Sequence, residues 1–362
     1  MNWPKHGGQP DVLHKQFNLS KGREILDFSA NIHPGGPPSF VTENLRESIE
    51  SIARYPDPDY GEARSHIAAF NSTETDQVLI TNGGAEAVFL AAKYFEGKRA
   101  LIVEPTFLEY ERACGHYHLE VKPVFLRVEE EFHFPLDQVL DELAETEVVF
   151  ICRPNNPSGT VVSEADIRIL LEKGKETGTF LVIDEAFADF LPKEEGDLTP
   201  LLNEFSNLIL LRSLTKMFAV PGVRAGYMLG APEVIRAVRE WQMPWSVNSF
   251  ASSLIPVLAG EEAAEFAAAS SRYVKGELER IRLQLSSLDF DMSPSSVNFY
   301  LLRDRRDPGL ADELLKFLLK KGIAARHTHN FNGLDGKYLR FAVLDKPAND
   351  QLLEKLAEWR DN

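Results

Sequence analysis

Four short segments of the 362-residue sequence hold residue types that could bind and transform a phosphorylated ligand, and each follows an apolar run. The first, Thr81–Glu86, reads TNGGAE, and its glycines would let backbone N–H groups approach an anion at the start of a helix. An ordinary strand-to-helix turn also accounts for this motif when it is taken alone. The second, Arg153–Gly159, reads RPNNPSG. Its prolines and glycine fix a turn, and its adjacent amides could donate to a phenolate-type oxygen without adding charge.

The third and fourth segments supply a carboxylate and an amine. The third, Phe180–Phe187, reads FLVIDEAF; helix capping or solvation accounts for most such acid pairs. The functional interpretation is a carboxylate that faces a pyridine nitrogen and keeps it protonated, which makes the ring a better electron sink. The fourth, Leu211–Lys216, reads LRSLTK. A lysine in such a place is usually a surface cation, but Ser213 and Arg224 beside it could both hold a phosphate, which favours Schiff-base chemistry at the lysine.

Alternating strands and helices must position these segments. Short apolar runs alternate with amphipathic stretches, which predicts a doubly wound, mostly parallel seven-stranded α/β sheet with ligands beyond the carboxyl ends of its strands. Several runs are apolar throughout, as expected when helices cover both faces of the sheet. The predicted strands are 77–81, 100–103, 119–125, 148–152, 180–184, 208–211 and 224–229, and the predicted helices between them are 85–94, 106–117 and 163–177.

The pattern changes after about residue 245. A long helix over 263–288 precedes a strand (297–302), a helix (307–321), two strands (323–326 and 338–343) and a closing helix (349–360), which together predict a smaller α+β domain. Residues 1 to about 25 are expected to form an irregular arm. We therefore predict an N-terminal arm and part of the small domain over 1–44, a large domain over 45–245, and the rest of the small domain over 246–362.

Composition excludes several classes of function. Lys and Arg number 39 against 55 Asp and Glu, so the formal charge is −16, which argues against nucleic acid or an anionic membrane as partner. Two cysteines, Cys114 and Cys152, form no disulfide framework or zinc pattern, and no metal is expected. No signal peptide and no apolar run of about 20 residues is found, so a cytoplasmic protein is expected.

Taken together, the four segments resemble those of pyridoxal-5′-phosphate (PLP) enzymes of fold type I, the class I and II aminotransferase-like proteins, over essentially the whole chain. NNPSG, DEAF, and SLTK followed by Arg224 are jointly specific. The resemblance implies that Lys216 carries PLP as a Schiff base and is the catalytic residue. It also implies that Asp184 pairs with the ring nitrogen and that Asn156 donates to the ring hydroxyl oxygen. It assigns the cofactor phosphate to Gly84, Ala85, Ser213 and Arg224.

Two further aromatic assignments come from the same resemblance. Tyr110, in the segment PTFLEY, is expected to stack on the cofactor ring, with Phe107 as the alternative. Tyr55 matches a tyrosine that reaches the cofactor phosphate of a partner subunit, which implies an obligate homodimer.

Within this superfamily the chain is similar to the histidinol-phosphate aminotransferase group, and nearest to the L-threonine-O-3-phosphate decarboxylases of cobalamin biosynthesis. Distinctive stretches carry this similarity: His6–Gly8, Leu26–Ile32, Tyr55–Tyr60 and Gln242–Asn248. Aminotransferases of the group usually have Tyr three residues after the ring-nitrogen Asp, whereas this chain has Phe187, as the decarboxylases do.

The resemblance therefore implies decarboxylation of L-threonine O-3-phosphate to (R)-1-amino-2-propanol O-2-phosphate and CO₂. Transamination of histidinol phosphate or a related amino acid is the alternative, and serine phosphate is a close variant of the substrate. By the same resemblance, Arg340 matches the arginine that binds the substrate carboxylate. This contact matters because the orientation of the substrate decides which bond at Cα breaks. The candidates for the substrate phosphate and nearby polar groups are His6, Asn31 and Arg326, and Asn156 also borders the substrate.

Two hypotheses from other classes follow from the same residues. A PLP-binding regulator without turnover usually brings a DNA-binding segment, and the N-terminal arm is too short for one. A nucleotide-binding α/β protein would account for the NGG motif but not for Lys216 together with Asp184.

Overall fold

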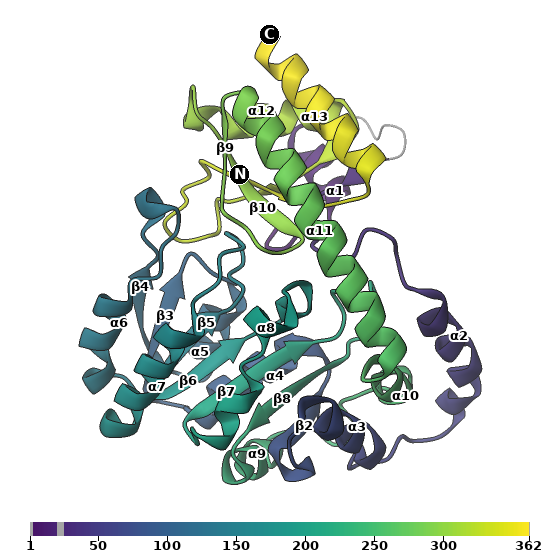
Figure 1. Cartoon of the computed structure of the whole chain (residues 1–362), viewed down its shortest axis with the longest axis vertical. Coiled ribbons are helices and arrows are strands. Elements are labelled where there is room, and N and C mark those ends of the chain that lie inside the picture. Colours follow the sequence, from purple (N-terminus) through teal and green to yellow (C-terminus); the bar gives the residue numbers. More distant parts are fainter. Residues whose placement is uncertain (1–2, 20–24, 362) are drawn as a thin grey trace.

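The computed structural model describes residues 3–19 and 25–361, and its lower part in Figure 1 is built on a seven-stranded sheet. The strand order is β2-β8-β7-β6-β5-β3-β4; β8 is antiparallel to both neighbours and the other pairs are parallel. The prediction of a mostly parallel seven-stranded sheet is therefore confirmed. Its strands are β2 (Val78–Thr81), β3 (Arg99–Glu104), β4 (Glu120–Phe125), β5 (Val148–Cys152), β6 (Phe180–Asp184), β7 (Leu208–Ser213) and β8 (Gly226–Gly230).

Helices cover both faces of this sheet, which explains why its central strands are apolar throughout. Along β6, Leu181 and Ile183 pack into one core and Val182 into the other, because successive side chains of a strand point to opposite faces. On the face of Val182 lie α4 (Gly83–Tyr94), α5 (Glu109–His116) and α9 (Pro232–Arg239); on the other face lie α6 (Leu136–Glu142) and α7 (Glu164–Thr177). Parallel strands are buried on both faces in this way in α/β proteins.

The upper part of Figure 1 is a second α+β unit. Its antiparallel sheet has the order β12-β13-β10-β9, and a separate parallel pair joins β1 to β11. The strands are β1 (Leu26–Asp27), β9 (Phe290–Met292), β10 (Phe299–Asp304), β11 (Ile323–Ala324), β12 (Arg326–His327) and β13 (Leu339–Ala342). The helices are α11 (Glu261–Ser287), α12 (Ala311–Lys320) and α13 (Lys346–Asp361). The β1–β11 pair brings an N-terminal segment onto this C-terminal unit.

Long and short helices connect the two units. The 27-residue α11 runs from α10 beside the large sheet up to β9, and α2 lies at the edge of the molecule (Figure 1). α10 (Ser249–Leu258) packs against α2 (Ser39–Glu47), α3 (Gly61–Asn71) and the 3₁₀ helix η1 (Ser48–Ala53).

The domain boundaries expected from the sequence stay a prediction. The remaining short helices are α8 (Lys193–Gly196), η2 (Thr75–Gln77), η3 (Val128–Glu130), η4 (Leu143–Glu145), η5 (Ala188–Phe190), η6 (Thr199–Asn203) and η7 (Pro308–Leu310).

Two local predictions were wrong. The N-terminal arm contains a helix, α1 (Pro10–Gln16), which begins on a proline that suits the first turn and buries Leu13. The single strand expected over 323–326 is divided, because β11 pairs with β1 whereas β12 pairs with β13.

Membrane and metal features were also sought in the described residues. No helix there is long and apolar enough to cross a bilayer. No group of three or more His, Cys, Asp or Glu side chains in those residues is arranged to hold a metal ion.

Candidate active site

The predicted site residues gather where the parallel strands of the large sheet end. Cys152 pairs with Asp184, and Asp184 pairs with Leu211, so the ends of β5, β6 and β7 lie in register at one edge. The loop that holds Asn156 follows β5, and the loop that holds Lys216 follows β7. Topology therefore brings together the amide, the carboxylate and the amine that the sequence separates by up to 60 residues.

The start of α4 forms an anion cradle beside this edge. The Asn82 side chain makes no capping hydrogen bond, and the Glu86 carboxylate instead accepts from the Asn82 N–H at 2.6 Å. The first N–H groups of the 12-residue helix are thus left without a side-chain cap. The guanidinium of Arg224 forms another side of the cradle. It lies so near Gly83 that a Cβ atom added there would be 2.7 Å from Arg224 Nη2.

Gly84 and Ser213 complete the same cradle. A Cβ atom added to Gly84 would lie 3.7 Å from the Cβ of Ser213, so the serine borders the start of the helix. The Ser213 hydroxyl also exchanges a 2.9 Å hydrogen bond with Thr215. Backbone N–H groups, a hydroxyl and a guanidinium are the donors that suit a phosphate. Gly83 belongs to the glycine motif found in the sequence but was not assigned to the phosphate, since its approach to Arg224 joins distant segments.

Lys216 is an unpaired amine at the centre of the site. Its Nζ atom makes no hydrogen bond or ion pair with the residues that the structure describes. Burial, and then the nearby charges of Arg224 and Arg340, lower the pKa of the amine to about 8, although Asp184 acts in the opposite direction. A lysine of this kind is neutral far more often at pH 7 to 8 than an exposed one and is correspondingly nucleophilic.

Asp184 is a buried carboxylate without a cation bonded to it. Tyr110 donates its hydroxyl hydrogen to Oδ2 at 2.8 Å, and the Ala186 N–H donates to Oδ1 at 2.9 Å. Among the described residues, no Lys, Arg or His nitrogen lies within 4.0 Å of it. Burial raises the pKa of Asp184, whereas the Tyr110 and Ala186 hydrogen bonds and the charge of Lys216 lower it. Such a carboxylate suits a protonated ring nitrogen.

Arg340 fixes the orientation of Asn156. Its Nη1 donates to Asn156 Oδ1, and its Nη2 donates to the Ser29 carbonyl at 3.0 Å. Because a guanidinium only donates, the amide oxygen must face Arg340, which leaves Nδ2 of Asn156 free to donate elsewhere. Within the described part of the chain, the Nε atom of Arg340 is buried without a hydrogen-bond partner, and burial lowers the pKa of this arginine to about 9. An anionic ligand would satisfy both the donor and the charge.

Tyr110 does not lie where the resemblance implied. Its side chain is fully buried, its hydroxyl is bonded to Asp184, and its ring stacks on Phe150 at 5.8 Å. The protein encloses its ring on all sides, so both the ring and the hydroxyl are committed to contacts within the chain. The alternative, Phe107, is half-buried and lies 6.3 Å from the ring of His6, so Phe107 is the better candidate for the stacking aromatic.

The N-terminal arm closes one side of the site, and Arg326 holds it there. The guanidinium of Arg326 donates to the Pro4 carbonyl at 3.1 Å and to the Lys5 carbonyl at 2.7 Å. His6 is the next residue after Lys5, and its Nε2 atom lies 3.1 Å from Glu109 Oε1. The sequence did not indicate that Arg326 anchors the arm or that Glu109 pairs with His6, because both contacts join distant segments.

The two arginines on this side have no carboxylate of the described chain in direct contact, although the more distant charge of Asp27 raises the pKa of Arg340. Arg326 and Arg340 have no carboxylate within 4.0 Å among the described residues. Burial lowers the pKa of Arg326 to about 10. Burial also lowers the pKa of His6, where Glu109 raises it and Arg326 lowers it further. Two buried arginines and a histidine near one another, with so little negative charge, form a site suited to an anion with more than one negative group.

The remaining predicted residues take three different positions. Asn31 is buried, and neither its amide nitrogen nor its amide oxygen has a hydrogen-bond partner among the described residues. Phe187 is buried with its ring 4.8 Å from that of Phe299. Tyr55 is 83% exposed and lies against Trp245, with 5.0 Å between ring centroids, so this chain by itself does not bury it in the site.

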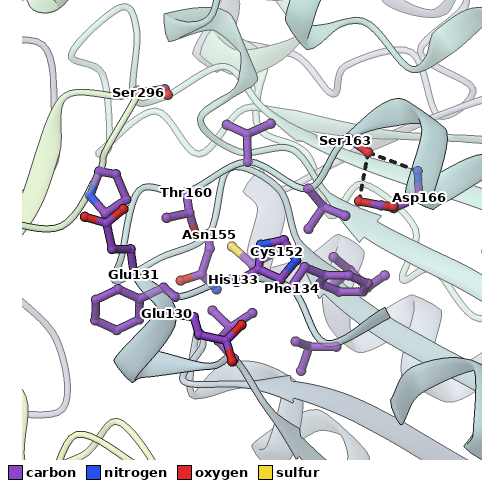
Figure 2. A pocket seen from close by; sticks show the side chains of 17 residues that line it. Glu130, Glu131, His133, Phe134, Cys152, Asn155, Thr160, Ser163, Asp166 and Ser296 are labelled. Atoms are coloured by element: carbon purple, nitrogen blue, oxygen red, sulfur yellow. Dashed lines mark hydrogen bonds between the residues drawn. The ribbon is translucent and has the colours of Figure 1, made fainter. Parts of the chain in front are cut away.

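A cavity of about 420 Å³ lies beside the end of β5 (Figure 2). Cys152 and Asn155 line it from the sheet, Glu130 and His133 line it from the loop after β4, and Ser296 lines it from the C-terminal unit. Its lining includes none of the predicted site residues, all of which the structure describes. The cavity is therefore a neighbour of the candidate site rather than the site itself.

The chemistry of the donors fits PLP. The cradle around Gly84 and Ser213 matches a phosphate, the uncompensated Asp184 matches a ring nitrogen, and the oriented Asn156 amide matches a ring oxygen. Lys216 supplies an amine whose pKa of about 8 leaves a neutral, nucleophilic fraction near neutral pH that can react with the aldehyde. The orphaned amide of Asn31 and the orphaned Nε of Arg340 remain for a substrate.

Comparison with known proteins agrees with this geometry. The model of the family "Aminotransferase class I and II" matches residues 23–356. A putative threonine-phosphate decarboxylase from Caldanaerobacter subterraneus subsp. tengcongensis is 35% identical over 90% of this chain and 88% of its own length. A threonine-phosphate decarboxylase from Salmonella typhimurium is 34% identical over 97% of this chain and 95% of its own. The crystal structure of the histidinol-phosphate aminotransferase from Clostridium acetobutylicum has a TM-score of 0.87 and 28% identity, covering 93% of this chain and all of that one.

Proposed function

This chain belongs to the aminotransferase class I and II family, and from that premise we propose that it is a PLP enzyme that decarboxylates L-threonine O-3-phosphate. The products are (R)-1-amino-2-propanol O-2-phosphate and CO₂, a step of cobalamin biosynthesis. Pyridoxal 5′-phosphate is the cofactor, held by Lys216, Asp184, Asn156 and the cradle that Arg224 closes.

The observation that carries the choice of substrate is the pair of buried, uncompensated arginines. Arg326 and Arg340 lie without a carboxylate within 4.0 Å among the described residues, and Asn31 beside the site has an unsatisfied amide. A substrate with both a carboxylate and a phosphate would supply the missing negative charge. We assign its carboxylate to Arg340, and its phosphate to the arm side, where His6 and Arg326 lie.

The reaction rests on different support. Phe187 has no hydroxyl to donate to the ring oxygen, and the two relatives described above, at 35% and 34% identity, both carry the name of the decarboxylase. The fold does not separate the activities, because a histidinol-phosphate aminotransferase has a TM-score of 0.87 with this chain. Transamination of histidinol phosphate is therefore the second candidate.

The protein's own residues have separate parts in this reaction. When bound, PLP supplies an electron sink for the pair of electrons left at Cα. Asp184 would hold the ring nitrogen in its protonated form, and the Nδ2–H of Asn156 would donate to the ring oxygen. Arg340 would bind the substrate carboxylate and so set which bond at Cα is broken. The Lys216 amine, whose pKa is about 8, is mostly protonated at pH 7 and would donate this proton to Cα after CO₂ leaves.

We also propose a homodimer in which Tyr55 reaches the cofactor phosphate of the partner subunit. Tyr55 and Trp245 are both exposed and lie against each other, and exposed apolar contacts of this kind often mark an interface. Large hydrophobic side chains near them in the sequence are also exposed: Ile49, Ile52 and Met243. The test is subunit complementation: a mixture of inactive Tyr55→Ala and inactive Lys216→Ala chains regains activity if sites are shared. A fully active monomer in sedimentation would contradict the proposal.

The central test is a product assay on the holoenzyme. With L-threonine O-3-phosphate and no keto acid, we expect stoichiometric CO₂ and an amino-alcohol phosphate. L-serine O-phosphate and histidinol phosphate with 2-oxoglutarate serve as comparison substrates. Keto-acid-dependent amino transfer without CO₂ release would overturn the decarboxylase proposal in favour of the second candidate.

A further inference from the structure

A buried polar network connects two of the proposed cofactor contacts, Asp184 and Asn156, on the side of these residues that faces the protein core. Tyr110, on α5, is completely buried and donates to Asp184 Oδ2 at 2.8 Å. Stacking on Phe150, with an interplanar angle of 22°, holds its ring in place. The Tyr110 hydroxyl can therefore reach Asp184 but cannot reach a ligand in the site.

Cys152 extends this network to Asn156. It is the last residue of β5, directly opposite Asp184, and its thiol interacts with the Tyr110 side chain. Its sulfur accepts from the Asn156 N–H at 3.3 Å and donates to the Pro154 carbonyl at 3.3 Å. From the other side, Cys152 lines the cavity in Figure 2. One thiol thus contacts both the Tyr110 that supports Asp184 and the backbone of Asn156.

We infer that Tyr110 is a positioning residue for Asp184, and that Cys152 joins it to Asn156 so that both cofactor-ring contacts share one support. The inference rests on the proposed PLP chemistry. A phenol that donates to a carboxylate stabilises its ionised form, by about 1.5–3 kcal/mol for a hydrogen bond to a charged group. Only the ionised form of Asp184 can hold a protonated ring nitrogen. Without the Tyr110 hydroxyl, the ionised form of Asp184 is less stable, so the proton between the ring nitrogen and Asp184 would lie closer to Asp184.

A purely structural role for Tyr110 is the competing explanation, since its ring is also part of the core. Tyr110→Phe separates the two, because it keeps the ring and removes only the hydroxyl. Tyr300→Phe is the matched control. Tyr300 is equally buried and also stacks on a phenylalanine, Phe341, but its hydroxyl has no hydrogen-bond partner in residues 3–19 and 25–361. Cys152→Ala has its own control in Cys114→Ala, the other buried thiol.

The experiment measures the visible absorption of the PLP-bound variants against pH, together with kcat and KM. For Tyr110→Phe we expect the pH midpoint of the absorption change to rise by about one unit, because a less positive ring raises the pKa of the lysine–cofactor linkage. We expect kcat to fall about tenfold and KM to change less than about twofold. Cys152→Ala should shift the midpoint in the same direction by less, and both controls should match the wild type.

Two outcomes would overturn the inference. One is a Tyr110→Phe variant with the wild-type midpoint and kcat; the other is an equal shift in Tyr300→Phe. If Tyr110→Phe does not fold, the Cys152→Ala and Cys114→Ala pair decides by the same midpoint. The absorption measurement needs bound PLP but no particular substrate. A wild type that binds PLP but releases no CO₂ would therefore sink the proposed reaction while leaving this test intact.

Discussion

Asp184 and Glu185 are consecutive, fully buried acids at the end of the same strand, yet their surroundings are opposite. Glu185 Oε1 lies 3.3 Å from Arg153 Nη1, and its Oε2 lies 2.9 Å from Arg212 Nε. Asp184 has only the neutral donors of Tyr110 and Ala186. Because successive residues of a strand point to opposite faces of the sheet, the two carboxylates lie in different surroundings. Arginines compensate the charge of Glu185, whereas no cation contacts Asp184 among the described residues.

The difference shows how to separate a structural charge from a functional one. A buried carboxylate that lies against two arginines has its charge compensated within the protein, so it needs no charged ligand. A buried carboxylate without a cation is costly to the folded protein, which is tolerated where a ligand supplies the charge. The sequence DEAF could not show which acid was which, and the partners in space decide it.

The largest effect on stability is expected when the pairing of Glu185 is removed. Glu185→Gln leaves Arg153 and Arg212 buried without their shared carboxylate, which should lower the free energy of unfolding by roughly 3–5 kcal/mol. Chemical denaturation of the apoprotein measures it. Activity per PLP-bound molecule should stay within about threefold of the wild type. An inactive but stable Glu185→Gln protein would break the division of roles between the two acids.

The mirror-image change is Asp184→Asn. It removes an uncompensated buried charge at nearly constant volume, so the apoprotein should be at least as stable as the wild type. Activity should fall about 10²–10³-fold, because the neutral amide no longer holds the ring nitrogen protonated. Steady-state kinetics on the PLP-saturated variant checks this. Loss of stability with activity retained would reverse the interpretation of this residue.

Glu104 offers a third buried carboxyl with neither arginine nor cofactor. It accepts from the Thr106 N–H at 2.8 Å and from the Asn332 amide at 3.1 Å, and burial raises its pKa to about 7. Between pH 4.5 and 7 the folded chain therefore binds more protons than the unfolded chain. Its contribution makes the free energy of unfolding fall with rising pH, by up to about 3 kcal/mol.

The measurement compares the wild type with Glu104→Gln, which cannot titrate. Unfolding free energies at several pH values between 4 and 8 should converge at low pH and separate as the pH rises, with the variant more stable at pH 8. Curves that stay parallel would show that Glu104 is ionised like an exposed glutamate.

The sequence predicted the elements of this site better than its supports. Strand periodicity and the turn residues gave β5, β6 and β7 within a residue or two, so Asn156, Asp184 and Lys216 were brought together as expected. The role of Tyr110 was missed, because a tyrosine three residues after Phe107 has the same local pattern whether it faces a ligand or the core.

The N-terminal arm was the other limit of prediction. Arg326 donates to backbone carbonyls that lie more than 320 residues away in the sequence. Every residue has such a carbonyl, so the sequence cannot show which one an arginine binds. The helix α1 was missed because seven residues are too few for a clear helical period. Contacts that depend on tertiary structure were thus beyond the sequence, whereas those at strand ends were not.

The most direct measurement of the central claim is reductive trapping of the cofactor on the protein. The holoenzyme is treated with borohydride, which makes the lysine–PLP bond permanent, and the labelled peptide is mapped by mass spectrometry. Lys216→Ala is the control, and its folding is checked by circular dichroism. The account predicts label on Lys216 alone and no label in the folded Lys216→Ala protein. A label on another lysine, or equal labelling of the variant, would contradict it.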